Sequence, residues 1–315
     1  MEEEIRNQAE DIPKFALQGR KSYHSKLKPS TLIFAGSGDS YAAAAFAQQL
    51  STGQVAASDP YELLRRISSV RGKNLVIVSV SGKTRANVEL ARRAKRFARR
   101  RIAITSNPDS PLANECDKTL ALQYRRAETL TSGTISFTTS LIACALILGQ
   151  LPKTVNVRAA LKKASQWARS LRAVRRGSFV FTGSSVNYAL SIYGAAKVRE
   201  VLGEKAEAEY PEQLGHSRLF TIDKRDDAVI CLSSGRDHAR QVHKLLDKNG
   251  FRSRLLTVTG DNIVQTSLEV AIHLQQLALV LAEKRGMKEC AFLGDPRKLK
   301  LSSRMIYLGS TLRTR

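Results

Sequence analysis

Three hydroxyl side chains and one glycine stand close together where an apolar segment gives way to a helical pattern. The run SVSGKT, residues 79–84, ends that segment and precedes the helix former RANVELARRA. Hydroxyl groups and the free N–H groups of a helix's first turn can surround one phosphate, whose charge the helix dipole favours. Gly82 lets the backbone approach closely. The run predicts a phosphate site made by Ser79, Ser81 and Thr84, with a capped turn that holds no ligand as the alternative.

A carboxylate and an ammonium group lie one helical turn apart in the segment GAAKVRE, which contains Lys197 and ends at Glu200. A desolvated carboxylate can carry a proton between two adjacent carbons, and a nearby cation or donor stabilises the enediolate that forms. The same spacing is typical of an ion pair on a helix surface. The two residues alone leave both interpretations open.

A histidine follows at position 216, in the run QLGH. An imidazole that titrates near neutrality can protonate the ring oxygen of a closed sugar and deprotonate its anomeric hydroxyl, which opens the ring. His216 can equally be a loop residue without a role. His238 and His243 lie five residues apart rather than the four that share a helix face, and no cluster of cysteines or carboxylates joins them. We therefore expect no metal site and no cofactor.

Two further polar turns precede helical patterns. GSGDS, residues 36–40, separates an apolar run from YAAAAFAQQL, and TSGT, residues 131–134, precedes the apolar pattern ISFTTSLIACALILGQL. Each turn can bring small polar groups to a ligand, or can serve packing alone.

Strands and helices alternate along the first half of the chain. Apolar runs at 31–36, 74–80, 101–106 and 118–122 indicate strands, and helical patterns lie between them. This alternation predicts an α/β fold with a parallel sheet that carries helices on both faces.

The second half of the chain repeats the first. SFVFTGSSVNYAL matches TLIFAGSGDSYAA, and DAVICLSSGRDH matches NLVIVSVSGKTR. The repeat indicates one duplicated α/β unit. In the second copy Leu232 stands where the first has Ser79, and Asp237 stands where the first has Thr84. A carboxylate caps a helix but repels a phosphate, so we expect the second copy to bind none.

This pattern predicts five parts of the chain. They are an N-terminal helix at 1–29, a phosphate-holding domain at 30–150, a helical linker at 151–176, a domain with the catalytic Glu and His at 177–290, and a C-terminal tail at 291–315 that closes over the site.

The composition is that of a globular protein with an unbalanced charge. Hydrophobic residues make up 43% of the 315 residues, which excludes disorder for most of the chain. Fifty-one Lys and Arg against 28 Asp and Glu give a formal net charge of +23. That charge allows nucleic acid, an anionic membrane or phosphorylated small molecules as partners. Aromatic residues are too few, at 6%, for many stacking platforms, and the basic run 91–101 fits the solvated face of a helix.

The sequence lacks the signals of export and membrane insertion. The N-terminus MEEEIRNQAEDIP has no apolar run, and the apolar stretch 135–148 is too short and too rich in hydroxyl groups to span a bilayer. The four cysteines form no CxxC pair, which is typical of reduced thiols. We expect a soluble cytoplasmic protein.

The motifs GSGDSY, SVSGKT, FTTSL, GAAKVRE and EAEYPEQLGHSRLFTID together carry a resemblance that covers roughly residues 30–300. The chain resembles tandem sugar-isomerase (SIS) proteins, most closely the isomerase half of glucosamine-6-phosphate synthase. It is also similar to the archaeal bifunctional phosphoglucose/phosphomannose isomerases. Nothing in it resembles the glutaminase domain of the synthase.

The resemblance implies two flavodoxin-like, doubly wound SIS domains and a role for each motif. Glu200 would be the base, Lys197 the lysine of the substrate site, and His216 a ring opener that reaches the site of the other subunit of a homodimer. A lysine of the C-terminal tail would close over the substrate, and Lys300 is preferred to Lys298. The remaining residues implied to contact the substrate are Gly36, Ser37, Ser40, Ser79, Ser81, Gly82, Thr84, Ser132 and Thr134.

Two residues depart from the pattern of the synthase. Lys83 stands where that enzyme has a glutamate, and Ile135 stands where it has a lysine. A lysine at 83 should aid phosphate binding but can change which sugar is recognised.

The function expected from these features is aldose–ketose isomerisation, or deamination, of a hexose or hexosamine 6-phosphate through a cis-enediolate. Bifunctional phosphoglucose/phosphomannose isomerisation is an alternative within the same class. A non-catalytic sugar-phosphate sensor is the alternative of another class, which Glu200 and His216 argue against. Nucleic-acid binding is motivated only by the net charge and is not expected, and neither is membrane binding.

Overall fold

The computed structural model describes residues 1–23, 27–171 and 177–307. They divide into two compact units, each built from separate stretches of sequence. We call the unit that contains Glu10–Arg125, Ile135–Thr154 and Phe292–Arg315 the first-sheet unit. The unit that contains Met1–Ala9, Arg126–Thr134 and Val155–Ala291 is the second-sheet unit.

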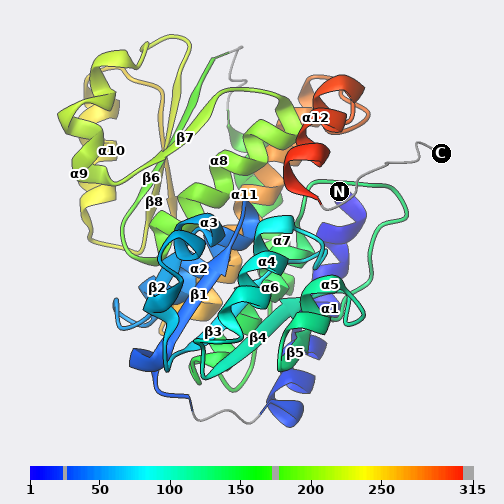
Figure 1. Ribbon diagram of the computed structural model, residues 1–315. Helices are drawn as coiled ribbons and strands as arrows, with labels where there is room; N and C mark the ends of the chain where they lie inside the picture. Colours follow the sequence, from blue (N-terminus) through cyan, green and yellow to red (C-terminus); the bar gives the residue numbers. More distant parts are fainter. Residues whose placement is uncertain (24–26, 172–176, 308–315) are drawn as a thin grey trace. The chain divides into compact units, whose positions relative to one another are not determined.

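A parallel five-stranded sheet forms the centre of the first-sheet unit (Figure 1). Its order is β2-β1-β3-β4-β5, which is the flavodoxin-like order 2-1-3-4-5. The central strands are buried along nearly their whole length, as expected of a parallel sheet whose two faces are both covered. The strands are β1 (Leu32–Gly36), β2 (Ala56–Ser58), β3 (Asn74–Val78), β4 (Arg100–Thr105) and β5 (Lys118–Ala121).

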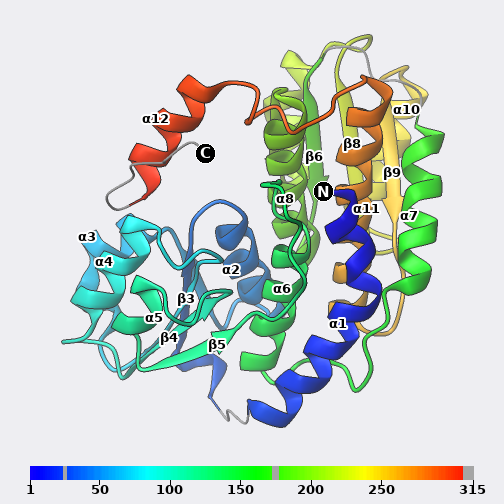
Figure 2. The ribbon, with the colours of Figure 1, turned by 90° about the vertical axis from the view of Figure 1, so that its right-hand side faces the viewer.

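Helices cover both faces of this sheet, with α3, α4 and α5 on one side and α2 and α6 on the other (Figure 2). On the first side, Ile33, Ala35 and Ile77 pack in one apolar cluster with Val88 and Ala91 of α4. α6 is buried along its entire length and packs against α2. The helices are α2 (Asp39–Leu50), α3 (Pro60–Arg65), α4 (Arg85–Ala94), α5 (Pro111–Glu115) and α6 (Ile135–Ile147).

The second-sheet unit has a parallel sheet of four strands in the order β7-β6-β8-β9. That order repeats the first four positions of the other sheet. The strands are β6 (Phe179–Gly183), β7 (Ala206–Glu209), β8 (Ala228–Ser233) and β9 (Ser253–Thr257). The helices are α7 (Arg158–Ser170), α8 (Val186–Leu202), α9 (Pro211–His216), α10 (His238–Lys248) and α11 (Ile263–Lys284).

The long helix α11 is the core helix of this unit and packs against both α7 and α8. Among the described helices it is the one long and apolar enough to cross a membrane. Two-thirds of its apolar window is buried inside the protein, however, which is typical of a core helix.

The predicted α/β fold with parallel sheets and helices is confirmed. The predicted domains 30–150 and 177–290 stay a prediction. The second-sheet unit contains residues 1–9 and 126–134 as well as 155–291. The predicted N-terminal helix is α1 (Glu2–Ser22), and only its first two turns belong to the second-sheet unit. Within the predicted tail, α12 (Pro296–Ile306) forms a helix. Parts of the predicted linker (172–176) and tail (308–315) lie outside the described residues.

Candidate functional site

The predicted phosphate turn connects β3 to α4 at the carboxyl edge of the first sheet, the edge where α/β folds bind ligands. Ser79 is 2% exposed, and its hydroxyl donates to the hydroxyl of Thr84, 3.4 Å away. The Ser81 hydroxyl accepts from the backbone N–H of Lys83 at 3.2 Å. Thr84 is the N-cap of α4, but its side chain caps no N–H group of the helix. The turn therefore gathers the three predicted hydroxyls beside a helix N-terminus.

Gly82 is required by this turn for two reasons. Its φ of +64° lies in the left-handed region, and a Cβ added to it would lie 2.0 Å from the hydroxyl oxygen of Ser110. Ser110 cannot easily move away, because its hydroxyl caps α5 by accepting from the N–H of Ala113. The packing of the turn against Ser110 thus leaves no room for a side chain at position 82.

The turn GSGDS connects β1 to α2 at the same edge, since β1 and β3 are neighbouring parallel strands. A Cβ at Gly36 would lie 2.4 Å from the carbonyl oxygen of Ser40, so packing alone accounts for this glycine. Ser37 is half-buried, Ser40 is buried, and the N–H of Ser40 donates to the carbonyl of Ser37 at 3.2 Å. The structure thus places all three predicted residues at the sheet edge.

In the second-sheet unit, Glu200 and Lys197 of α8 meet Ser132 of the loop 126–134. The Lys197 ammonium donates to Glu200 Oε2 and to Ser132 Oγ, each at 2.6 Å. Ser132 Oγ in turn donates to Glu200 Oε2, also at 2.6 Å. We call these three residues the Glu200 cluster. Lys197 is fully buried, whereas 40% of the Glu200 side chain is exposed. The cluster is therefore not an ion pair on a helix surface.

The cluster keeps Glu200 ionised. Burial opposes the charge, but the Lys197 ammonium and the hydrogen bonds from Lys197 and Ser132 outweigh it, so the pKa of Glu200 lies below its ordinary value. Both hydrogen bonds end on Oε2. Within the described residues no hydrogen bond reaches Oε1, which leaves this oxygen open to accept a proton.

The backbone beside Ser132 belongs to the same arrangement. The carbonyl of Gly133 accepts from Lys197 Nζ at 3.2 Å and from the Tyr193 hydroxyl at 2.9 Å. The next residue, Thr134, was expected to contact the substrate. It is instead fully buried, and its hydroxyl donates to Glu4 at 2.6 Å. Sequence reasoning missed Glu4, because its type alone does not separate it from the exposed Glu2 and Glu3 beside it.

His216 ends α9 with its side chain 70% exposed. Its imidazole lies 3.3 Å from Glu212, and His238 lies 3.7 Å from the same carboxylate. In the part of the chain that the structure describes, no hydrogen bond or ion pair joins His216 to the Glu200 cluster. Its predicted role in the other subunit of a homodimer stays a prediction.

The two tail lysines lie on α12 of the first-sheet unit, and both are exposed. Lys298 donates its backbone N–H to Asp295, the N-cap of α12, and pairs with it through Nζ at 3.2 Å. Just beyond α12, a bridge pairs Tyr307 with Thr84, so the described part of the tail reaches the predicted phosphate turn. That contact brings the tail, though neither lysine itself, to the turn.

The equivalent turn of the second sheet already holds a negative charge. Asp237 accepts from the Ser233 hydroxyl at 2.9 Å, from the Ser234 N–H at 2.8 Å and from the Arg240 N–H at 3.0 Å. It also caps α10. The Asp237 carboxylate thus already uses these donors of the turn. Among the described residues, no three His, Cys, Asp or Glu side chains are grouped as a metal site would require.

The region of the first sheet is similar to a known protein family. Residues 27–148 match the family model described as the SIS domain. This part of the chain, which includes the first sheet, is therefore similar to SIS domains. It is 25% identical over 221 residues to a glutamine–fructose-6-phosphate aminotransferase (isomerizing) of Streptomyces coelicolor, a match that covers 60% of this chain and 35% of the relative. The chain thus spans only about a third of the length of this curated relative.

Two solved structures share the fold over nearly the whole chain. The glucosamine-6-phosphate deaminase of Thermotoga maritima is 20% identical with a TM-score of 0.72, and the match covers 90% of this chain and 94% of that one. The C-terminal domain of the glucosamine-fructose-6-phosphate aminotransferase of Francisella tularensis is 19% identical with a TM-score of 0.70, covering 91% and 96%. At these identities the likeness shows the fold. The SIS model covers the first sheet only, so a second SIS domain stays a prediction.

Proposed function

We propose that this protein is a sugar-phosphate isomerase or deaminase that moves a proton between two adjacent carbons of its substrate. The observation that carries this proposal is the Glu200 cluster, in which a fully buried lysine holds a partly exposed carboxylate at 2.6 Å. Burying an ammonium group is costly, and a pair that only stabilised a helix would not need it. A fixed cation beside a base is what an enediolate requires.

Each member of the cluster has a distinct task in this proposal. Glu200 removes the proton from one carbon through its open Oε1 and returns it to the neighbouring carbon. The charge of Lys197 and the hydroxyl of Ser132 hold the carboxylate in place and balance the negative charge that develops on the substrate oxygens. His216 opens the sugar ring, and we propose that it does so in the partner subunit of a homodimer.

The phosphate belongs, in this proposal, to the turn between β3 and α4. Ser79, Ser81 and Thr84 offer hydroxyls, the first turn of α4 offers N–H groups, and Gly82 allows a close approach. The GSGDS turn is proposed for the sugar hydroxyls, and Lys300 for closure by the tail. The names of the relatives, an aminotransferase that isomerises and a deaminase, support this class of substrate. We expect the protein to act in the cytoplasm.

A sugar-phosphate sensor without catalysis is the second candidate. Ile135, at the position where the synthase resemblance would place a lysine, is fully buried at the start of α6. An apolar core residue there removes one charged group from the expected site. This observation weakens the resemblance to the synthase and leaves a binding role without turnover as the alternative.

The deciding experiment is proton NMR of the protein in deuterated water with fructose 6-phosphate, glucosamine 6-phosphate and mannose 6-phosphate in turn. We expect interconversion or exchange of the C2 proton with at least one of them. Glu200→Gln should slow it by about 100-fold or more, because the base is lost. Glu289→Gln removes an equal charge at an exposed position and should leave the rate unchanged.

The possible outcomes separate the candidates. Ammonium release from glucosamine 6-phosphate would identify a deaminase, and interconversion without ammonium an isomerase. Line broadening of a sugar phosphate without any exchange would overturn the enzyme proposal in favour of a sensor.

A further inference from the structure

The last three residues of the loop 126–134 are held from two sides. On one side Ser132 and the Gly133 carbonyl bind Lys197, as described above. On the other side Thr134 is fully buried, and its hydroxyl donates to Glu4 rather than to a residue of the Glu200 cluster. Whatever holds Thr134 therefore fixes the position of Ser132, two residues away.

Glu4 holds the side chain of Thr134. It lies in the first turn of α1, is 8% exposed, and accepts the Thr134 hydroxyl on Oε2 at 2.6 Å. Its other oxygen accepts the backbone N–H of Ala127 at 3.4 Å. One carboxylate thus ties the start and the end of the same loop together.

Two buried glutamines hold the backbone of Thr134. Gln275 of α11 donates its amide to the Thr134 carbonyl at 3.2 Å. Gln8, one turn after Glu4 on α1, donates to the side-chain oxygen of Gln275 at 2.7 Å, which places the start of α1 beside α11 (Figure 2). Both glutamines are fully buried. The end of the loop is therefore anchored to α1 and α11, which are both far from it in the sequence.

Polar groups of this kind are a poor means of stabilising a core. A buried carboxylate and two buried amides must recover their lost hydration through hydrogen bonds, and apolar side chains of similar size would stabilise the unit at less cost. Their value lies in direction, since hydrogen bonds fix positions to a fraction of an ångström. The three 2.6 Å contacts of the Glu200 cluster need that accuracy.

We propose that Glu4, Gln8 and Gln275 are positioning residues of the proton-transfer centre, acting through Thr134 to hold Ser132 against Glu200 and Lys197. This inference rests on the proposed function for its meaning in catalysis. It predicts an effect on the turnover number rather than on binding, because none of the three residues is placed at the phosphate turn.

The test compares two substitutions of Thr134 in the full chain. Thr134→Val keeps the shape and removes the hydroxyl, whereas Thr134→Ser keeps the hydroxyl. We expect Thr134→Val to lower kcat by about 10- to 100-fold with KM for the sugar phosphate within about twofold. Thr134→Ser should recover most of kcat. Glu4→Gln should behave like Thr134→Val, while Glu3→Gln, an equal change at an exposed neighbour on α1, should behave like the unchanged protein.

A second readout does not depend on turnover. The titration of the Glu200 carboxyl, followed by carbon-13 NMR, reports its surroundings directly, and the charged groups beside it are Lys197 and Arg199. In Thr134→Val the low pKa of Glu200 should rise toward its ordinary value, because the hydrogen bond from Ser132 is loosened. Thermal unfolding shows whether each variant is folded.

The two proposals fail in different ways. If the unchanged protein exchanges no sugar proton, the proposed function is wrong, and the Glu200 titration still decides the inference. If Thr134→Val is folded and leaves both kcat and the Glu200 titration unchanged, the inference is wrong whatever the function. A rise in KM alone, without a change in kcat, would also overturn it.

Discussion

The buried ammonium group of Lys197 lies among oxygen acceptors. Three of them are the Glu200 carboxylate, the Ser132 hydroxyl and the carbonyl of Gly133. Ser132 accepts a hydrogen bond from Lys197 and donates its own hydrogen to Glu200. Both bonds to Glu200 end on its Oε2. In the proposed function Oε1 exchanges the proton while Lys197 and Ser132 hold the other oxygen.

At Gly82, the cost of backbone strain can be separated from the cost of crowding by comparison with another glycine. Gly82→Ala should lower the free energy of unfolding by about 2–3 kcal/mol, from backbone strain of about 1 kcal/mol and loss of the Ser110 cap of about 1 kcal/mol or more. Gly72 has a similar φ of +69° with no atom near its Cβ position. Gly72→Ala should therefore cost about 1 kcal/mol, from strain alone.

Urea unfolding of the two variants provides the measurement. The affinity for inorganic phosphate, measured by calorimetry, should fall in Gly82→Ala and stay unchanged in Gly72→Ala. Equal losses of stability in both variants would show that the contact with Ser110 has no effect.

At the scale of elements, two similar strand–turn–helix segments differ at the N-terminus of their helix. α4 begins at a threonine whose side chain caps nothing, and α10 begins at Asp237, which accepts three hydrogen bonds. A helix N-terminus that is left uncapped is available to an outside anion. Of the residues that differ between the two turns, the one at the N-cap, Thr84 against Asp237, can be exchanged by a single substitution.

The substitution Thr84→Asp places the carboxylate of the second turn at the same position in the first turn. The substitution should raise the free energy of unfolding by about 0.5–1 kcal/mol, because the aspartate caps α4 and favours its dipole. The same substitution should weaken the binding of inorganic phosphate by at least about tenfold, because the carboxylate repels the anion and takes its donors. Thr84→Asn caps without the charge and separates the two effects. Retained phosphate affinity in Thr84→Asp, measured by calorimetry, would contradict the assignment of this turn.

The central strands and both turns could be predicted from sequence, because strands buried on both faces are continuous apolar runs that end in small polar residues. β2 and β7 were missed, since strands of three and four residues carry little pattern. The prediction of a tail at 291–315 misses α12, although Asp295 before Pro296 is a typical start signal of a helix.

The candidate site was predictable only in part. The residue types at 197 and 200 were identified, but their burial was not, because a spacing of three residues is the same on a covered and on an exposed helix face. Ser132 belongs to the Glu200 cluster and Thr134 does not. This difference depends on hydrogen bonds to residues far away in the chain, Lys197 for Ser132 and Glu4 for Thr134. No local pattern contains that information.

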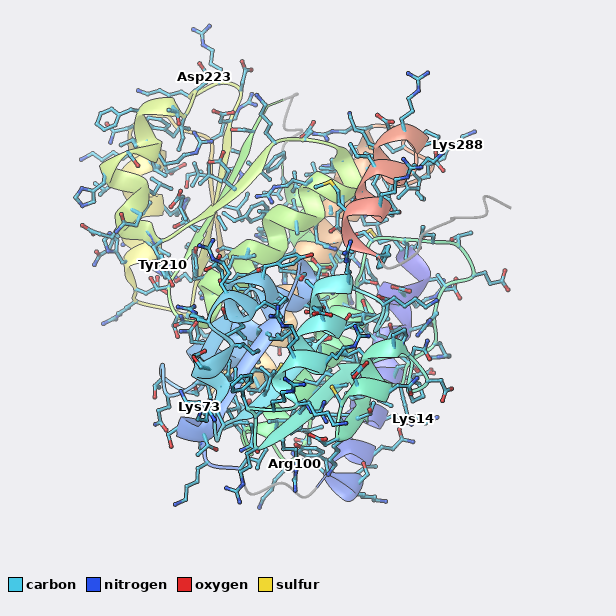
Figure 3. The ribbon with its side chains drawn as sticks, in the orientation of Figure 1. Lys14, Lys73, Arg100, Tyr210, Asp223 and Lys288 are labelled. Atoms are coloured by element: carbon cyan, nitrogen blue, oxygen red, sulfur yellow. The ribbon has the colours of Figure 1, made fainter. Side chains whose placement is uncertain are left out.

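At the scale of the whole molecule, the net charge of +23 is the most unusual property. Many of the basic side chains are exposed, among them Lys14, Lys73, Arg100 and Lys288 (Figure 3). Such a charge raises the local concentration of anionic ligands and speeds their arrival, and it does so less at high salt. It therefore agrees with the proposed phosphorylated substrate without selecting one. In the proposed function, selection comes from the two turns of the first sheet and from the Glu200 cluster.

Asp237 has a consequence for how the protein responds to its surroundings. A carboxylate that belongs to the chain acts at an effective concentration that no change in the solution can alter. The second turn is thus permanently occupied, whereas occupancy of the first would follow the supply of phosphate. We expect saturating phosphate to slow amide hydrogen exchange around residues 79–84 and to leave exchange around 233–237 unchanged, because only a site that can be empty gains stability from its ligand. Of these two similar turns, only the first would then respond to the concentration of phosphate.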